Sequence, residues 1–203
     1  MPPFSVMHVC MGNICRSPMA ERLLLFRARE ALGEHADRID ELLLSHSTGS
    51  GGWHQGQSMN PPAAQQLRMR GIDHDGFAAR QLASSHVDSS DLILTATAEQ
   101  AAYVASLRPD AAARTFVLGE FGRLLRHTAD RITQLPASEP TAVAVQQRGE
   151  ALVHLVDQLR AGSTPRPSDD LDDPWGLNDS EFARVADEID ATVRPLASAL
   201  LRG

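Results

Sequence analysis

Short apolar segments alternate with segments of helical periodicity over the first half of the chain. Buried strands are predicted where the apolar runs are short, at residues 4–9, 42–47, 91–95 and 115–118. Helices are predicted where apolar residues recur at helical spacing, at residues 18–32, 62–70 and 98–107. Pro18 fits the first turn of the first helix, where its missing N–H costs nothing, and Gly71 closes the second.

This alternation predicts an α/β protein of three αβα layers, with a four-stranded parallel sheet flanked by helices. Ligands in such folds bind at the carboxyl ends of the strands. Cys10 directly follows the first predicted strand, so the sequence places a candidate site there.

The second half of the chain is mostly helical in pattern. Helices are predicted at residues 120–135, 141–159 and 179–201, and a stretch rich in Pro and Asp, residues 162–173, separates the last two. We find no internal repeat and no second apolar core, so residues 1–203 are expected to form a single domain.

The composition argues against several classes of function. The net charge of -7 argues against a general nucleic-acid binder. The chain contains no lysine, which excludes a Schiff-base lysine and the nucleotide-binding loop that needs one. No signal peptide or membrane span is visible, and we expect a cytoplasmic protein with no membrane partner. No metal site is expected. Seven of the eight histidines show no ligand spacing with other candidates, and we interpret them as surface or packing residues: His8, His35, His46, His54, His86, His127 and His154.

The two cysteines lie in one short segment, which suggests chemistry rather than a disulfide scaffold. Five residues separate Cys10 from Arg16, enough for the loop to curl around an anion with its amides pointing inward. Gly12 and Asn13 permit the unusual backbone angles of such a curl. Arg16 offers a planar fork to two phosphate oxygens, and the following helix start favours an anion and a thiolate at Cys10. The predicted phosphate-binding residues are Met11, Gly12, Asn13, Ile14, Cys15, Arg16 and Ser17.

A cysteine and an arginine at this spacing could simply be a buried cysteine beside a helix cap. The complete segment, residues 9–18, also has the strand end, the curled loop, the arginine and the helix start that a phosphate-binding loop requires. Residues 9–18 resemble the phosphate-binding loop of the low-molecular-weight protein tyrosine phosphatases. Looser matches follow at Ser47-Thr48-Gly49, Gly52-Trp53-His54, Gly71-Ile72 and Ala79-Arg80-Gln81-Leu82. The resemblance covers residues 4–94 and the chain from Asp172 onward.

The resemblance implies a phosphatase with Cys10 as nucleophile, Arg16 as phosphate clamp and Asp173, directly before Pro174, as general acid. Neighbouring Asp172 competes for the acid role, and the acidic run would otherwise be interpreted as a solvated linker. The implied partners are a phosphotyrosine protein or a small phosphate ester, with inorganic phosphate as product and no cofactor.

Three further residues take roles from the resemblance. Trp53 and Trp175 are implied at the mouth of the pocket, where aromatic walls favour phosphotyrosine, although either could instead pack in the core. Cys15 is implied as the redox partner of Cys10 in a reversible disulfide, against the alternative of a small apolar loop residue.

The chain departs from the family pattern in three places. Phe77 stands where the family often has a histidine supporting the loop serine, which leaves either His74 as a replacement or a different support for Ser17. Thr97 stands where the family usually has an aspartate supporting the loop arginine. Extra helical sequence, residues 119–171, precedes the acid loop.

Two other functions stay open from the sequence. The same loop could serve a thiol-dependent arsenate reductase, although cysteines for an internal relay outside the loop are missing. A non-catalytic phosphoprotein-binding module is the second alternative, favoured by the changes at Phe77 and Thr97.

Overall fold

The computed structural model describes residues 1–128 and 141–201. Its strands and helices follow in this order: β1 (Phe4–Cys10), α1 (Arg16–Leu32), η1 (Gly33–Arg38), α2 (Ile39–Leu42), β2 (Leu43–Gly49), α3 (Pro61–Met69), α4 (Ser84–Asp88), β3 (Leu92–Thr95), α5 (Ala98–Leu107), η2 (Pro109–Arg114), β4 (Thr115–Val117), α6 (Leu118–Leu125), η3 (Arg126–Thr128), α8 (Ala142–Arg160), η4 (Pro167–Asp169) and α9 (Asp179–Leu201).

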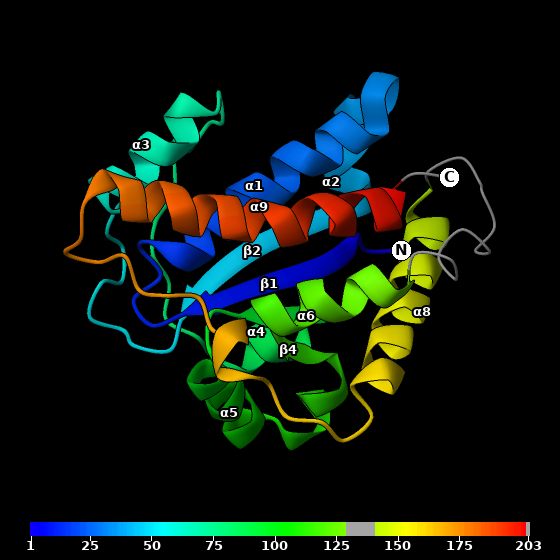
Figure 1. Cartoon of the computed structure of the whole chain (residues 1–203). Helices are drawn as coiled ribbons and strands as arrows, with labels where there is room; N and C mark the ends of the chain where they lie inside the picture. Colours follow the sequence, from blue (N-terminus) through cyan, green and yellow to red (C-terminus); the bar gives the residue numbers. More distant parts are fainter. Residues whose placement is uncertain (129–140, 202–203) are drawn as a thin grey trace.

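The four strands form one parallel sheet in the order β2-β1-β3-β4, with helices on both faces (Figure 1). The α/β fold class inferred from the alternating pattern is therefore confirmed. Because β1 lies in the interior of the sheet, its carboxyl end at Cys10 is flanked by the ends of β2 and β3.

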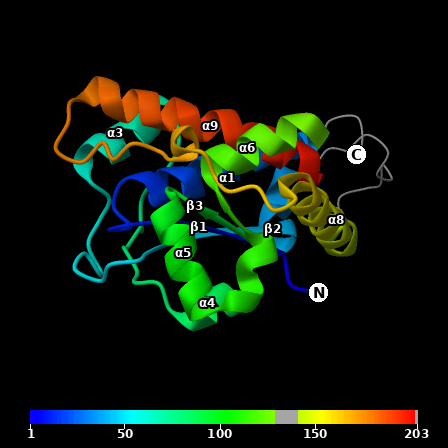
Figure 2. The same cartoon turned by 60° about the horizontal axis from the view of Figure 1, so that its bottom comes forward.

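Side chains of β1 alternate between two cores, as the period of a strand requires. Phe4 and Val6 belong to the large core under α1, α6 and α9, whereas Met7 and Val9 belong to the smaller core under α4 and α5. Figure 2 shows the same division, with α9, α6 and α1 on one side of the sheet and α4 and α5 on the other. Burying each large apolar side chain contributes roughly 1.5–3 kcal/mol.

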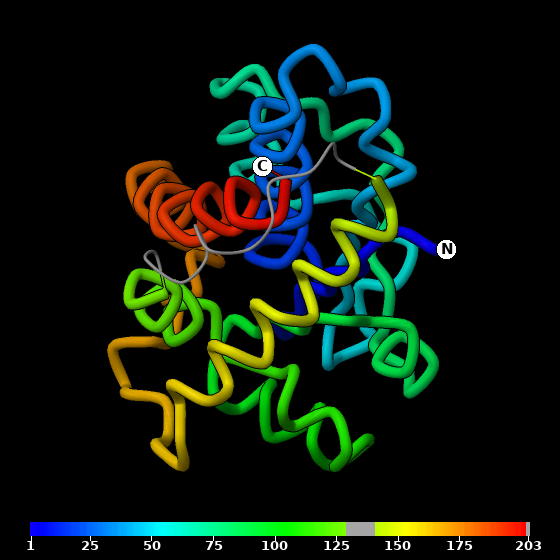
Figure 3. Tube along the Cα trace, turned by 90° about the vertical axis from the view of Figure 1, so that its right-hand side faces the viewer, coloured from blue at the N-terminus to red at the C-terminus, as the bar shows by residue number. Residues whose placement is uncertain are grey.

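Helix α8 lies beside the amino end of β1, opposite the candidate site (Figures 1 and 3). Gly149 makes this approach possible, because a Cβ there would lie 2.3 Å from the Phe4 ring. Of the extra helical sequence expected before the acid loop, α8 therefore lies at the amino end of the sheet, remote from Cys10.

Several boundaries differ from the sequence prediction. The fourth strand ends at Val117 and runs directly into α6, so the helix expected from residue 120 begins at Leu118. The part of that expected helix beyond residue 128 lies outside the described residues. The short helices η1, α2 and α4 were not predicted, because segments of four to six residues carry too little periodicity. Among the described residues, no helix has the length and apolar character needed to cross a bilayer.

Candidate active site

The loop after β1 curls around the sulfur of Cys10. The Asn13 amide donates to Cys10 Sγ at 3.3 Å, and Ser17 Oγ lies 3.1 Å from the same sulfur. Residues three and seven positions downstream therefore both return to Cys10, which is the curl expected of an anion cradle. Helix α1 begins directly afterwards at Arg16, so its positive N-terminal end faces the same place.

Asn13 holds the curl together. It adopts a left-handed backbone with φ 54°, which asparagine tolerates better than most residues. The Arg80 amide donates to Asn13 Oδ1 at 2.7 Å, which turns the Asn13 Nδ2 group toward Ser17 Oγ and Ser47 Oγ, both at 2.9 Å. Since Ser17 Oγ accepts from Asn13, its own hydrogen is left for Cys10 Sγ or for the Thr48 carbonyl at 3.3 Å.

The end of β2 supports the loop from behind. Ser50 and Gly51 donate backbone hydrogen bonds at 2.9 Å to the carbonyls of Cys10 and Met11. Gly49 lies so close that a Cβ there would be 2.7 Å from the Met11 carbonyl oxygen. A larger residue at this position would push the loop out of shape.

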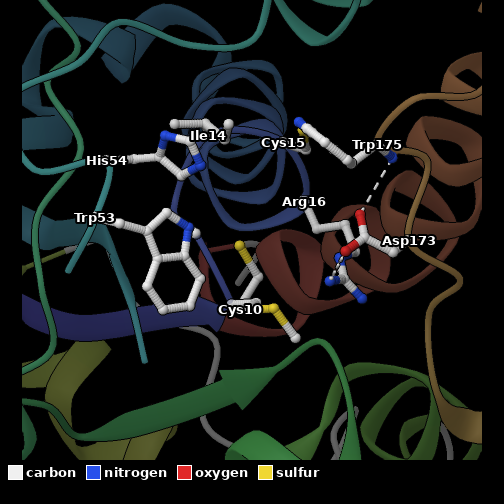
Figure 4. A pocket seen from close by; sticks show the side chains of 10 residues that line it. Cys10, Ile14, Cys15, Arg16, Trp53, His54, Asp173 and Trp175 are labelled. Atoms are coloured by element: carbon white, nitrogen blue, oxygen red, sulfur yellow. Dashed lines mark hydrogen bonds and ion pairs between the residues drawn. The ribbon is translucent and has the colours of Figure 1, made fainter. Parts of the chain in front are cut away.

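Arg16 is buried, with 4% of its surface exposed, and holds the segment before Pro174. Its Nη1 donates to the Leu171 carbonyl at 2.9 Å, and its Nη2 donates to Asp173 Oδ2 at 2.8 Å. Figure 4 shows the guanidinium and the Asp173 carboxylate turned toward one another. The clamp and the acid predicted from the sequence therefore lie in contact.

Three contacts fix the segment that carries Asp173. The Leu171 amide donates to the Ala96 carbonyl at 2.8 Å, Asp170 accepts from the Ala98 amide, and Asp169 pairs with Arg123 in α6. These bonds connect the segment to the carboxyl end of β3 and to the start of α5. They place Asp173 over the loop although 157 positions separate it from Arg16.

The rival acid, Asp172, points elsewhere. Its carboxylate accepts from Arg184 of α9 at 2.8 Å, and 72% of the side chain is exposed. It is absent from the walls of the pocket, which Asp173 lines.

The loop forms the floor of a cavity of about 230 Å³. Its walls are formed by Cys10, Met11, Gly12, Ile14, Cys15, Arg16, Trp53, His54, Asp173 and Trp175. The two tryptophans, 63% and 65% exposed, stand at its mouth and not in the core (Figure 4). All three predicted catalytic residues and both predicted rim residues are thus brought together.

His54 is the pocket residue that the sequence analysis missed. A Cβ on Gly12 would lie 2.9 Å from the His54 ring, so the ring rests directly on the loop. Its Nδ1 lies 2.7 Å from Gln57 Oε1. The sequence signal was its place in the Gly52-Trp53-His54 match, which says nothing about the direction of the ring.

Cys15 is a free, buried thiol that also lines the cavity. Burial raises the pKa of Cys15 to about 12; the charges of Cys10 and Asp173 add to this shift, and Arg16 opposes it. At neutral pH Cys15 is therefore protonated.

Comparison with known proteins places this geometry in a family. The family model described as low molecular weight phosphotyrosine protein phosphatase matches residues 5–134. The chain belongs to this family. A low molecular weight protein-tyrosine-phosphatase of Bacillus subtilis, YfkJ, is 39% identical over 104 residues, 51% of this chain and 61% of the relative. The probable phosphatase EpsP of Ralstonia solanacearum is 34% identical over 76% of this chain and 97% of its own.

The fold is shared more widely than these sequences. The YwlE arginine phosphatase of Geobacillus stearothermophilus superposes with a TM-score of 0.62 at 21% identity, over 96% of this chain and 91% of its own. The match to the Bacillus subtilis relative spans less than two thirds of that protein, so membership of the family and the shared fold are what these comparisons establish.

The structure accounts for both substitutions in the family pattern. His74 does not replace the histidine missing at Phe77: it contacts Arg68 at 3.2 Å and Asp75, whereas Phe77 packs against the core. Ser17 is instead supported differently, by hydrogen bonds with the Asn13 side chain and the Thr48 carbonyl.

Thr97 plays no part in holding Arg16. Its hydroxyl donates to Gln100 Oε1 at 2.7 Å, inside the first turn of α5. The Leu171 carbonyl is the neutral acceptor that Arg16 has instead of a carboxylate at residue 97.

Proposed function

We propose that this chain is a protein-tyrosine phosphatase that hydrolyses phosphate monoesters through a phosphocysteine intermediate. One observation carries the proposal: the Cys10 sulfur lies at the floor of a cavity, within hydrogen-bond reach of Ser17 and the Asn13 amide, with Arg16 and Asp173 in the same wall. A nucleophile, an anion clamp and a proton donor around one cavity are what phosphoryl transfer from an ester requires.

In the first step the Cys10 thiolate attacks phosphorus and the bond from phosphorus to the ester oxygen breaks. Met11 to Ser17 surround the transferred group, and the Arg16 fork binds two of its oxygens. Asp173 pairs with Arg16 in the structure, so an entering dianion competes with it for the guanidinium. Once displaced and protonated, Asp173 gives its proton to the leaving phenolate.

In the second step water attacks the phosphorus of phosphocysteine and the bond between sulfur and phosphorus breaks. Asp173, now a carboxylate, takes the proton of the water. Ser17 donates its hydrogen to the departing sulfur. The Asn13 side chain favours this direction, because its Nδ2 group donates to Ser17 Oγ and occupies that oxygen as an acceptor. Inorganic phosphate and the free thiolate result, and no cofactor takes part.

The pocket favours an aromatic phosphate ester. Trp53 and Trp175 stand on its rim and expose most of their surface, which lets a phenyl ring lie between them while its phosphate reaches the floor. A phosphoserine side chain is too short to hold its phosphate on the floor and still contact the rim. We infer that the substrates are phosphotyrosine proteins or small aryl phosphates.

A peptide panel tests the reaction and the substrate together. Peptides of one sequence carrying phosphotyrosine, phosphoserine, phosphothreonine or phosphoarginine are compared for phosphate release by the wild type and by Cys10→Ser. We expect release from phosphotyrosine only, and none with Cys10→Ser, which still binds phosphate. Faster release from phosphoarginine would overturn the substrate class but leave the nucleophile in place.

The same experiment addresses the two other functions raised by the sequence. Arsenate reduction with an added small thiol, without ester hydrolysis, would make the chain a reductase. Binding of phosphotyrosine peptide without turnover by the wild type would make it a binding module.

A further inference from the structure

A second, much smaller cavity lies behind the loop, between β1, the end of β3, α1 and Leu171. Its volume is about 10 Å³, close to the smallest space that accommodates one water molecule. All the residues that line it are buried, and they include His8, Arg16 and Leu171. His8 and Arg16 bring polar atoms to an otherwise largely apolar space.

The hydrogen bonds of His8 define which ring nitrogen carries the proton. His8 Nε2 lies 3.2 Å from Ser45 Oγ, and Ser45 Oγ donates its single hydrogen to the Glu21 carbonyl at 3.1 Å. Ser45 must therefore accept from His8, so Nε2 carries the hydrogen and Nδ1 is a bare acceptor. Burial, with a smaller contribution from His46, lowers the pKa of His8 to about 3, so the ring is neutral.

His8 Nδ1 is buried and has no hydrogen-bond partner among the residues that the structure describes. A buried acceptor without a donor costs about 1–3 kcal/mol, so such atoms are normally paired with protein or water. His8 lines the small cavity, and this space leaves room for a donor beside the ring.

Arg16, which also lines this cavity, has a donor to spare. A guanidinium carries five N–H groups. Leu171 and Asp173 each take one, and Arg16 Nε is buried with no partner in the described part of the chain. A phosphate bound in the loop uses two donors of the fork, which leaves at least one N–H for another acceptor.

We propose that one buried water molecule occupies the small cavity, accepts a hydrogen bond from the Arg16 guanidinium and donates one to His8 Nδ1, which makes His8 a positioning residue for Arg16. The role of His8 in turnover rests on the proposed function of Arg16 as phosphate clamp; the water site does not. From Arg16 through water, His8 and Ser45 to the Glu21 carbonyl, every hydrogen bond points the same way, and such chains strengthen one another. His8 thus supplies support that Thr97, bonded to Gln100, does not give.

The water and the tautomer are tested on the wild-type protein. A crystal grown with inorganic phosphate, at a resolution that defines water, should show a single peak within about 3.2 Å of both Arg16 and His8 Nδ1. Nitrogen-15 spectra should show His8 protonated at Nε2 and bare at Nδ1. Direct contact between the two side chains, a cavity without water, or a proton on Nδ1 would overturn the proposal.

Three variants test the positioning role. His8→Phe removes the acceptor and should raise the inhibition constant of inorganic phosphate roughly tenfold or more, with a lower kcat for p-nitrophenyl phosphate. His8→Asn can place its carbonyl oxygen near the position of Nδ1 and should stay within about threefold of the wild type. The matched control is His46→Phe, since His46 is buried in the same sheet and hydrogen-bonds Ser5 and Ser90, away from the cavity.

We expect His46→Phe to lower the melting temperature but to leave the phosphate inhibition constant unchanged. Equal effects of His8→Phe and His46→Phe, or a His8→Asn variant as impaired as His8→Phe, would exclude the positioning role. If His8→Phe does not fold, the wild-type crystal and spectra still decide. If the water is present but the protein hydrolyses no ester, the proposed function alone is wrong. If the protein hydrolyses esters but the water is absent, this inference alone is wrong.

Discussion

We expect binding and catalysis to depend most on Arg16. Its fork holds Leu171 and Asp173 at once, and a lysine ammonium has neither the reach nor the planar geometry to do the same. We expect Arg16→Lys to lower kcat/KM for p-nitrophenyl phosphate by roughly 10²–10³-fold, the cost of losing one oriented donor to a developing anion. The control is Arg29→Lys, an exposed position on the same helix, where activity should not change. Comparable losses in both variants would exclude a clamp at Arg16.

Cys15 should make a disulfide with Cys10 only slowly at neutral pH. After oxidation of Cys10 to the sulfenic acid, the Cys15 thiolate must displace hydroxide from the Cys10 sulfur. Because burial raises the pKa of Cys15 to about 12, the thiolate fraction, and with it the rate, should rise about tenfold per pH unit between pH 7 and 9. Quenched mass spectrometry after one equivalent of hydrogen peroxide measures this rate. Cys15→Ser should form no disulfide, and a rate independent of pH would contradict the prediction.

Among the elements, the strand–loop–helix unit at Cys10 was the most predictable, because an apolar run, a glycine turn and a proline all lie within fifteen residues. The support of Arg16 was not predictable. It comes from the Leu171 carbonyl, and a backbone acceptor leaves no mark in residue type. His8 looked like a surface or packing residue because its partner Ser45 belongs to the next strand, and only strand register brings the two together.

The segment from Asp169 to Trp175 presents one carboxylate to the pocket and another to α9. Asp173→Asn should slow phenyl phosphate by roughly 10²–10⁴-fold, and the better leaving group of p-nitrophenyl phosphate far less. It should also tighten inhibition by phosphate, because an anion then no longer competes with Asp173 for Arg16. Asp172→Asn is the matched control, since it removes only an exposed pair with Arg184. If Asp172→Asn instead showed the leaving-group effect, the acid would be misassigned.

For the whole molecule, the alternation of strands and helices was enough to predict the parallel sheet, its covering helices and the end at which the site lies. It could not place α8, whose contact with β1 depends on Gly149 accommodating the Phe4 ring 145 positions away in sequence. That residues 1–203 form a single domain stays a prediction of the sequence.

Two buried histidines should set how the stability of the whole molecule depends on pH. Burial lowers the pKa of His8 to about 3 and that of His46 to about 4, against an ordinary value near 6.5. Below pH 6.5 the unfolded chain therefore binds protons that the folded chain does not, so the free energy of unfolding falls as the pH falls from 6.5 toward 4. Each histidine contributes up to about 1.4 kcal/mol per pH unit. Glu21 and Glu120, whose pKa burial raises, act in the opposite sense.

The difference between the wild type and His46→Phe isolates one histidine, because both proteins retain the two glutamates. Urea unfolding at pH 6.0, 5.5, 5.0 and 4.5 should give a shallower loss of stability for His46→Phe, by about 1 kcal/mol per pH unit once the pH is well below 6.5. The variant begins less stable at pH 7, since it loses the contacts with Ser5 and Ser90, and the two curves should approach each other as the pH falls. Parallel curves would contradict the prediction. They would mean that His46 is charged in the folded protein, although it is buried between two hydroxyl groups.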